Sequence, residues 1–565
     1  MDQLFEQLAA DYVAEVPALS PVSATWLGDH RFDGDLDEVS PEARAREAAF
    51  CRSYLDRLGR IPKGQLSRAN RVDAAMLEHS LRAGLWHLEE LQEWAWNPLG
   101  YTGLTGSAVY TLVARDFAPL PQRLGHVASR LAQFPRLLDQ VRQTLEPARV
   151  PRVHAETAVK QNRGILGVLD HMVKPHAAGL PPADRDRLTQ AMETARAAIE
   201  EHQRWLENEL VPRAAGDFRL GAERYDRKLA FTLNTPLTRR QVRERAESEL
   251  RRVRDEMYEV AAGLYRKQHP YVRLPGRPSQ AYRQAIIRAG LEMACQETLK
   301  PDDLVTAASQ SLARLTALVR EGGFVAVPPD PVEVIVMPEF QRGTSLAYCD
   351  SPGPLDVGQR TFYAIAPPPA DWTEDQLRSF LREYHRRSLE NLTVHEAMPG
   401  HFLQLTHANR YPSTLRAMLA SGVFIEGWAV YAERLMVEQG VYGDDPLMRL
   451  TVLKWYLRGI ANAIIDQAIH AEGMTEKEAM ALMIEGTFQE EREAAAKWVR
   501  AQLTSAQLST YFVGYLEHAG LRRDVEGAWA GRFDLRKYHD GVLSFGSPPM
   551  RYVRALMLDL PIDEA

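Results

Sequence analysis

The sequence predicts a mainly helical protein with a small β-sheet inserted past the middle of the chain. From the start to about Gly322, apolar residues recur every three or four positions, which is the period of packed amphipathic helices. Between Gly323 and Pro369, short β-branched and aromatic runs stand between prolines and glycines, which is typical of a few strands. We therefore expect one integrated domain with three parts: N-terminal helices (1–322), a β-rich segment (323–372) and C-terminal helices (373–565).

The N-terminal part shows both long helices and interruptions. Residues 239–260, RRQVRERAESELRRVRDEMYEV, alternate charges that would pair at i,i+4 spacing on a solvated helix face. Stretches with proline and glycine interrupt the helical pattern at 97–107, 213–221 and 274–278. We expect chain breaks there, although none of these stretches is long enough to be a flexible linker between domains.

The β-rich segment holds the runs VPPDPVEVIVMPEF and QRTFYAIAPPP. Prolines at both ends favour a short edge strand, and an exposed edge could pair with an extended peptide. The alternative is that these strands only connect the helical parts. Helix resumes at Thr373, because TEDQ forms a capping box and apolar residues then recur at helical spacing from Leu377 to Tyr384.

Composition excludes several classes of protein. Of the 565 residues, 45% are hydrophobic and 25% charged, so a folded chain is expected rather than a disordered one. The net charge is −7 and basic residues are scattered among acids, which argues against nucleic acid as a partner. The most apolar stretch, 417–436, is interrupted by charges, so we expect no membrane span and no membrane partner.

The cysteines and the N-terminus lead to an expectation about location. Cys51, Cys295 and Cys349 lie far apart and form neither a CxxC pair nor an even disulfide framework. The first residues, MDQLFEQLAADYVAEVP, carry acids where a signal peptide needs a basic start and an apolar run. We therefore expect a cytoplasmic protein. Nothing in the sequence indicates its oligomeric state.

The motif with the clearest chemistry is His395-Glu396-Ala397-Met398-Pro399-Gly400-His401. In the zinc-hydrolase motif HExxH, two histidines four apart bind zinc from one helix face and the glutamate is the general base. Here the histidines are six apart, which on a regular helix leaves them about 120° apart. Proline inside a helix removes the hydrogen bond to the carbonyl four residues back, so we predict a kink at 398–400 that brings His401 round to His395.

A zinc site needs a third protein ligand, and the segment FIEGWAVYAERLM offers two carboxylates on one helix. Glu426 is the better ligand, because Gly427 beside it permits close approach of another backbone. Glu433 lies two turns further on, about 10 Å along the axis, and could orient a ligand histidine instead. The structural alternative is that Glu396 belongs to a capping box with Thr393 and that the histidines only cap helix ends.

A polar stripe runs through the apolar helix that follows, at Arg458, Asn462, Asp466 and His470. The functional interpretation is that this stripe borders a cleft and that Asp466 orients His470 toward the substrate. The alternative is a salt-bridged solvent face. On the functional interpretation, His470 is a candidate catalytic residue.

HEAMPGH followed by FIEGWAVYAE resembles domain-of-unknown-function family 885, whose members look like distant relatives of helical zinc peptidases such as thimet oligopeptidase and angiotensin-converting enzyme. The likeness extends through ATWLGDHRFDG, DFRLGAERY, DQAIHAEGMTEKEA and FDLRKYHDGVLSFGSPP, so it covers nearly the whole chain. It implies a bilobal helical fold with a deep cleft, with zinc held by His395, His401 and Glu426 and with Glu396 as the base. Such peptidases commonly present a Tyr or His to the oxyanion. By this resemblance we name Tyr511 for that role, with His470 and His539 as rivals, although Tyr511 could equally be a core residue.

We therefore expect a zinc-dependent hydrolase in which Glu396 takes a proton from a metal-activated water and passes it to the leaving group. Peptides as substrates follow from the resemblance, and the residues alone indicate metal-assisted hydrolysis of peptides or small amides. One alternative is a non-haem iron(II) enzyme, since two histidines and a carboxylate also bind iron. Another is a catalytically silent peptide-binding protein that retains the fold.

Overall fold

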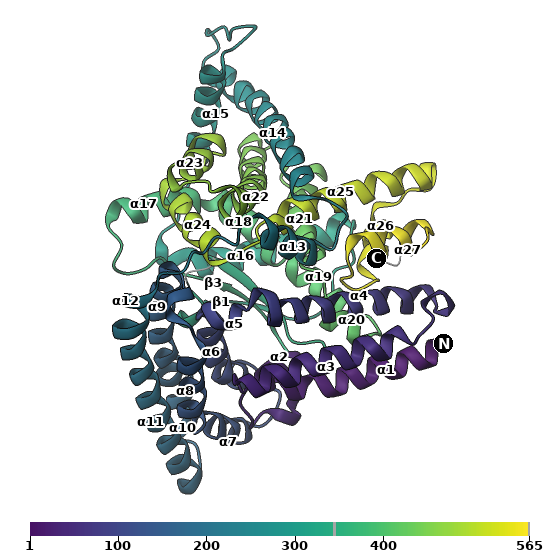
Figure 1. The fold of residues 1–565 in the computed structure, drawn as a ribbon. Helices are drawn as coiled ribbons and strands as arrows, with labels where there is room; N and C mark the ends of the chain where they lie inside the picture. Colours follow the sequence, from purple (N-terminus) through teal and green to yellow (C-terminus); the bar gives the residue numbers. More distant parts are fainter. Residues whose placement is uncertain (343–345, 563–565) are drawn as a thin grey trace.

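The computed structural model describes residues 1–342 and 346–562, and Figure 1 shows helices throughout with one small sheet among them. This confirms the expected mainly helical class. The N-terminal part forms sixteen α-helices within the described residues: α1 (Asp2–Glu15), α2 (Pro21–Leu27), α3 (Pro41–Gly59), α4 (Arg68–Trp86), α5 (Glu93–Trp96), α6 (Leu99–Val113), α7 (Leu120–Leu131), α8 (Phe134–Thr144), α9 (Arg152–Val168), α10 (Lys174–Ala177), α11 (Pro182–Trp205), α12 (Val211–Arg213), α13 (Ala222–Leu233), α14 (Arg239–Gln268), α15 (Gln280–Ala294) and α16 (Leu304–Gly322).

The sheet lies where the β-rich segment predicts it. Its strands are β1 (Val332–Val336), β2 (Ala347–Asp350) and β3 (Thr361–Ile365), in the spatial order β1-β3-β2. Strand β3 is central and fully buried; it pairs parallel with β1 and antiparallel with β2. Both β1 and β2 are therefore edge strands of this three-stranded sheet.

The C-terminal part is again helical and holds the predicted motif. Its helices are α17 (Glu374–Glu383), α18 (Arg386–Glu396), α19 (His401–Ala408), α20 (Thr414–Met418), α21 (Gly422–Glu438), α22 (Pro446–Glu472), α23 (Glu476–Ala481), α24 (Glu491–Leu503), α25 (Ser509–Trp529), α26 (Leu535–Leu543) and α27 (Met550–Leu558). The capping box predicted at Thr373 is present, since its side chain accepts from the backbone of Gln376 and the Gln376 side chain accepts in return.

Helices α21, α22 and α25 pack together at the centre of the C-terminal part (Figure 1). Helices α21 and α25 cross at Gly427 and Gly514, where a Cβ added to Gly427 would lie 2.4 Å from the Gly514 carbonyl carbon. No larger residue fits at this crossing. The glycine beside Glu426 thus permits the close backbone approach that the sequence indicates, and it fixes the position of α21 in the core.

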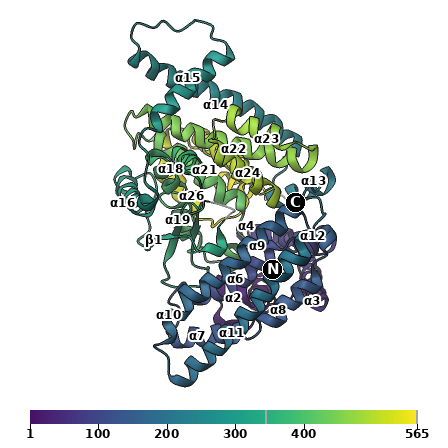
Figure 2. The ribbon, with the colours of Figure 1, turned by 90° about the vertical axis from the view of Figure 1, so that its left-hand side faces the viewer.

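The N-terminal and C-terminal parts interlock. Helix α20 packs on α1 and α4, and the fully buried Arg416 of α20 forms an ion pair with the buried Asp73 of α4. In Figure 2 the hairpin of α14 and α15 projects from one end of the molecule and α7, α10 and α11 lie at the other, with the sheet between them. The candidate site lies in the helices next to that sheet.

The stretch 97–107 does not break the chain as predicted, because α6 runs through it. A Cβ on Gly106 would lie 2.3 Å from the ring of Phe340, so this glycine serves helix packing rather than a turn. The helical prediction for 239–260 is confirmed, as these residues lie within α14. Within residues 1–342 and 346–562, no helix is both long and apolar enough to span a membrane.

Candidate metal centre

The two histidines of the motif lie on separate helices. Helix α18 ends at Glu396 and α19 begins at His401, and the Met398–Pro399 peptide bond between them is cis. The structure thus shows a complete break where we predicted a kink within one helix. The physical reason is the same, because Pro399 cannot continue α18. The break lets α19 start in a new direction and brings the imidazole ring centroids of His395 and His401 within 4.8 Å.

Two contacts hold this break in place. The indole N–H of Trp428 on α21 donates to the Pro399 carbonyl oxygen at 2.9 Å. Gly400 packs against the end of α18 so closely that an added Cβ would lie 2.0 Å from the His395 carbonyl oxygen. Only glycine fits there, so Pro399 ends the first helix and Gly400 permits the second helix to start beside it.

The side chains of His395, His401 and Glu426 converge. Oε2 of Glu426 lies 3.4 Å from Nε2 of His401 and 3.7 Å from Nε2 of His395, and three ligand atoms of this group lie within 4.8 Å of one another. Ligand atoms about 2.1 Å from a tetrahedral ion lie about 3.4 Å apart, so these spacings fit zinc. The Glu426 Oε2 atom is buried and, among the described residues, has no hydrogen-bond partner. A metal ion would satisfy it.

Glu433 fixes the orientation of His395. The Nδ1–H of His395 donates to Oε1 of Glu433 at 2.7 Å, and the Asn391 amide donates to the other oxygen of Glu433 at 2.6 Å. With Nδ1 as the donor, the lone pair of Nε2 faces Glu426. Metal-binding histidines commonly have such support from a carboxylate, and this hydrogen bond is the contact that the alternative, orienting role of Glu433 requires.

Electrostatics favour a cation in this cluster. Burial disfavours the charged imidazole of His395, but the neighbouring carboxylates of Glu426 and Glu433 outweigh this and raise its pKa well above the usual range. Burial also opposes ionisation of Glu426, yet the two histidines lower the pKa of its carboxyl. Burial raises the pKa of Glu396, although both imidazoles act in the opposite direction. The carboxylates of Glu426 and Glu433 beside two imidazoles thus make a site that takes up positive charge.

A cavity of about 530 Å³ opens in front of the cluster. His395, Glu396, His401 and Glu426 line it, together with the edge strand β2 from Ala347 to Cys349. Glu396 therefore faces the same space as the three candidate ligands. The edge strand that could pair with a peptide lies along the wall of that space.

Tyr511 of α25 also lines the cavity, and its ring stacks on that of His395 with centroids 6.3 Å apart. Its hydroxyl oxygen accepts from the guanidinium of Arg500 at 3.0 Å. Burial raises the pKa of Tyr511, although Arg500 acts against it, so the phenol keeps its proton near neutral pH. Tyr511 thus supplies a protonated hydroxyl group to the residues that line the cavity with the candidate metal ligands.

His470 does not lie in the cavity. Its Nε2 lies 2.8 Å from the carbonyl oxygens of Ala501 and Thr504, and its ring stacks on Tyr225. Asp466 accepts from Ser509 and from the backbone of Ala506 instead of orienting His470. A spacing of four residues turns about 40° per step on a helix, so the stripe winds away from the cavity after Arg458 and Asn462, which do line it.

His539 is also excluded from the cavity. Its Nε2 lies 2.8 Å from the Tyr431 hydroxyl and its Nδ1 2.7 Å from the Phe324 carbonyl oxygen, so both ring nitrogens are engaged in the core. Of the three oxyanion candidates, Tyr511 alone lines the cavity with His395, His401 and Glu426.

Several residues of the cavity were not predicted from the sequence. Lys497 and Arg500 of α24 line the cavity. Gln507 lies close to it, with its Nε2 atom 3.5 Å from Oε1 of Glu426. The spacing of Glu493, Lys497 and Arg500 would place them on one helix face, but nothing in the sequence shows that this face turns toward His395. Their position depends on how α24 packs.

Comparison with known proteins identifies the family. The sequence profile of a bacterial protein family of unknown function, DUF885, matches residues 21–557. The chain belongs to the DUF885 family. No curated protein matches it.

Two solved structures resemble this DUF885 protein over nearly its whole length. One is a "putative lipoprotein of unknown function" from Shewanella oneidensis, with 31% identity, a TM-score of 0.80 and coverage of 98% of this chain and 99% of that one. The other is a "putative lipoprotein" from Colwellia psychrerythraea, with 19% identity, a TM-score of 0.78 and the same coverage. The second likeness shows the shared fold alone.

These descriptions contradict the expected cytoplasmic location, which was wrong. The cysteines gave poor guidance for a physical reason. Cys51 and Cys295 are buried and Cys349 is half-buried, and burial raises the pKa of all three thiols. Such thiols form little reactive thiolate, so their unpaired state does not report the compartment.

Proposed function

We propose that this DUF885 protein is a zinc-dependent hydrolase that cleaves peptides or small amides. The observation that carries the proposal is the unsatisfied Oε2 of Glu426, which lies between the Nε2 atoms of two histidines at ligand–ligand distances. His395, His401 and Glu426 would hold the ion. Zinc in such a site lowers the pKa of a coordinated water to about 7 and polarises a carbonyl group.

Glu396 is the general base of the proposed reaction. It is the residue next to His395, it faces the cavity, and burial raises the pKa of its carboxyl, which strengthens it as a proton acceptor. It would accept a proton from the attacking water and return it to the leaving amine. The Tyr511 hydroxyl would donate a hydrogen bond to the carbonyl oxygen as negative charge develops there, supported by Arg500.

Two features support peptides as the substrate class. Strand β2 forms an edge of the sheet and lines the cavity, so an extended backbone could lie against it. The resemblance of the motifs to helical zinc peptidases, with a bilobal fold around a deep cleft, favours the same substrates. These two features bear only on the substrate class. The positions of His395, His401 and Glu426 do not depend on them.

The test is the substitution Glu396→Gln in zinc-loaded protein, with a mixed peptide library as substrate and mass spectrometry as readout. The variant should keep its zinc and its fold and lose hydrolysis, because an amide cannot accept the proton. Glu476→Gln, on the exposed face of α23, is the matched control and should cleave normally. Unchanged cleavage by Glu396→Gln, or no cleavage by the zinc-loaded parent protein, would overturn the proposal.

A further inference from the structure

Helix α24 turns a charged face toward the cavity. Glu493, Lys497 and Arg500 are spaced four and three residues apart and all line the cavity. Residues at this spacing share one helix face, and Lys497 lies about 4.5 Å along the axis from Arg500. Arg500 contacts Tyr511, which stacks on His395. Lys497 and then Glu493 therefore lie about one and two helical turns further from the candidate metal ligands.

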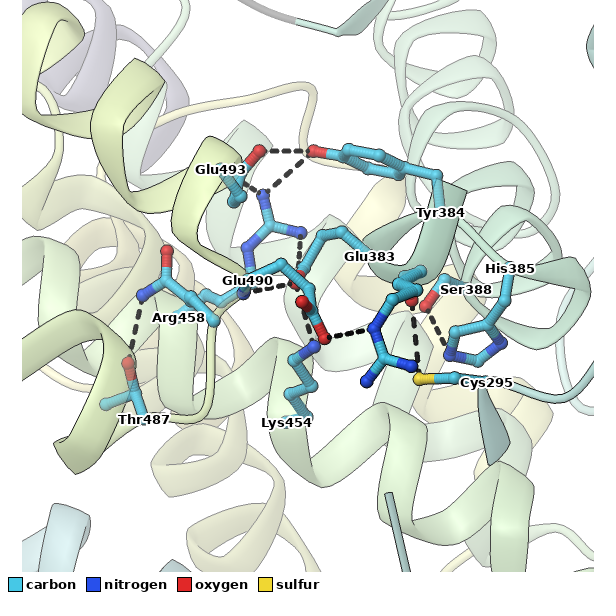
Figure 3. A network of polar contacts seen from close by, with 12 residues as sticks. Cys295, Glu383, Tyr384, His385, Ser388, Lys454, Arg458, Thr487, Glu490 and Glu493 are labelled. Carbon is cyan, nitrogen blue, oxygen red and sulfur yellow. Dashed lines mark hydrogen bonds and ion pairs between the residues drawn. The ribbon is translucent and has the colours of Figure 1, made fainter. Parts of the chain in front are cut away.

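The buried acids Glu383 of α17 and Glu493 of α24 already have partners, as Figure 3 shows. The fully buried Glu383 accepts from the ammonium of Lys454 at 2.8 Å and from the backbone N–H of Glu490 at 2.9 Å. Glu493 accepts from the Arg458 guanidinium and from the Tyr384 hydroxyl. The two carboxylates are thus matched by Lys454 and Arg458.

Lys497 and Arg500, on the same face of α24 as Glu493, are left without such a match. Lys497 is only 7% exposed, and its ammonium lies 3.9 Å from the nearest carboxylate oxygen, on Glu493, which is beyond hydrogen-bond distance. Burial lowers the pKa of Lys497 to about 7. Arg500 has no carboxylate within 4.0 Å among the residues that the structure describes. Both side chains line the cavity, so an anion that enters it would meet the charge of Arg500 and would favour the protonated form of Lys497.

We propose that Lys497, assisted by Arg500, binds the terminal carboxylate of a peptide substrate, so that the enzyme removes short units from the C-terminus. The inference rests on the proposed hydrolase function. A terminal carboxylate belongs to the leaving side of the scissile bond, about 3.3–3.6 Å further for each residue. A cation one helical turn beyond Arg500 matches a terminus one or two residues past the cleaved bond. In that step the C–N bond breaks, hydroxide of water joins the acyl carbon and its proton goes to the leaving amine.

Binding to the zinc-loaded Glu396→Gln variant, measured by calorimetry, tests this directly, because substrate is not consumed. The probes are one peptide as the free acid, the same peptide as the C-terminal amide, and an amide whose last residue is glutamate. The free acid should bind about 10- to 100-fold more tightly than the first amide, since a charge-assisted contact is lost. Adding Lys497→Met should abolish that preference, and Lys477→Met, on the exposed face of α23, should preserve it.

Equal binding of the acid and the plain amide would overturn the inference. Equal binding of the acid and the glutamate amide would show that a side-chain carboxylate is recognised and would also overturn it. The parent enzyme gives a readout that needs no Lys497 variant, as kcat/KM should fall by a similar factor on amidation. If both forms are cleaved equally while Glu396→Gln is inactive, the inference alone fails; if Glu396→Gln stays active, the proposed function fails.

Discussion

Glu433 and His395 form a hydrogen bond of 2.7 Å between helices α21 and α18, with Nδ1 of the imidazole as the donor. Because Glu426 lies on α21 too, seven residues earlier, one helix supplies both a candidate metal ligand and the carboxylate that orients another. Any shift of α21 would therefore move two parts of the site together. The glycine crossing of α21 with α25 and the bond from Trp428 to Pro399 prevent such a shift.

The first prediction concerns that carboxylate. Glu433→Gln keeps the shape of the side chain and an acceptor for His395 but removes the charge. Zinc affinity should fall about 10- to 100-fold, which is typical when the carboxylate partner of a ligand histidine is altered. Competition with a chromophoric chelator measures this. Glu438→Gln, in the exposed last turn of the same helix, should bind zinc as the parent does; equal affinity in both variants would remove the orienting role.

The second prediction separates catalysis from binding at Tyr511. Tyr511→Phe removes only the hydroxyl that faces the cavity, so zinc content and KM should change little. Loss of a hydrogen-bond donor to a developing oxyanion should lower kcat about 10²- to 10³-fold. Steady-state kinetics with one defined peptide give the two constants. Tyr515→Phe, one turn further along α25, is the control, and a kcat that drops equally in both variants would argue for a structural role.

The third prediction tests the break between α18 and α19. Gly400→Ala should destabilise the protein by about 3 kcal/mol or more, because the new methyl group would collide with the carbonyl oxygen of His395. Denaturant unfolding measures the change. Gly422→Ala, at the start of α21 with no atom within 4 Å of the added methyl, should be nearly neutral. A stable Gly400→Ala protein with normal zinc content would show that the close approach is unnecessary.

The fourth prediction is that Lys497 lowers stability. The pKa of Lys497 is about 7 in the folded protein against 10.5 for the free side chain, mainly because the ammonium group is buried. The positive charges of Arg500 and Arg458 lower this pKa further, and the negative charges of Glu493 and Glu383 act against the shift. Between these values the unfolded chain binds more protons, so stability from this group rises with pH and the full penalty applies below about pH 7. Lys497→Met should therefore raise the free energy of unfolding at pH 7 by about 2 to 4 kcal/mol.

Thermal unfolding at several pH values checks this. The gain of Lys497→Met over the parent should shrink as pH rises from about 7 to 10 and vanish above that range. Glu493 keeps Arg458 and Tyr384 as partners in the variant, so no carboxylate is orphaned. A gain that does not depend on pH would contradict the buried-charge explanation. A residue that lowers the stability of the fold and also lines the cavity is best explained by a role in function.

The convergence of His395, His401 and Glu426 could be predicted from the sequence because its determinants are local. Pro399 and Gly400 between two histidines, and a carboxylate beside Gly427, each have a chemical meaning that short-range geometry supplies. The end of α16 at Gly322 is equally local, since Gly323 takes the left-handed conformation after it. In each case one or two residues determine the local backbone conformation.

The rest depends on packing between distant segments. His470 lies four residues beyond Asp466 on an apolar helix, and only the turn of that helix against Ala501 and Thr504 shows that it points away from the cavity. Lys497 and Arg500 stand about a hundred residues after the histidine motif, so no spacing rule links them to it. The glycines of 97–107 look like breakers until Phe340 is seen to pack against Gly106.

A crystal structure of the zinc-loaded protein, with anomalous data collected at the zinc absorption edge, tests the central claim most directly. We predict one strong anomalous peak about 2.0–2.2 Å from Nε2 of His395, Nε2 of His401 and Oε2 of Glu426, next to Glu396. His401→Ala should remove that peak. A parent protein without a peak at these three atoms, or with zinc bound only elsewhere, would contradict the account.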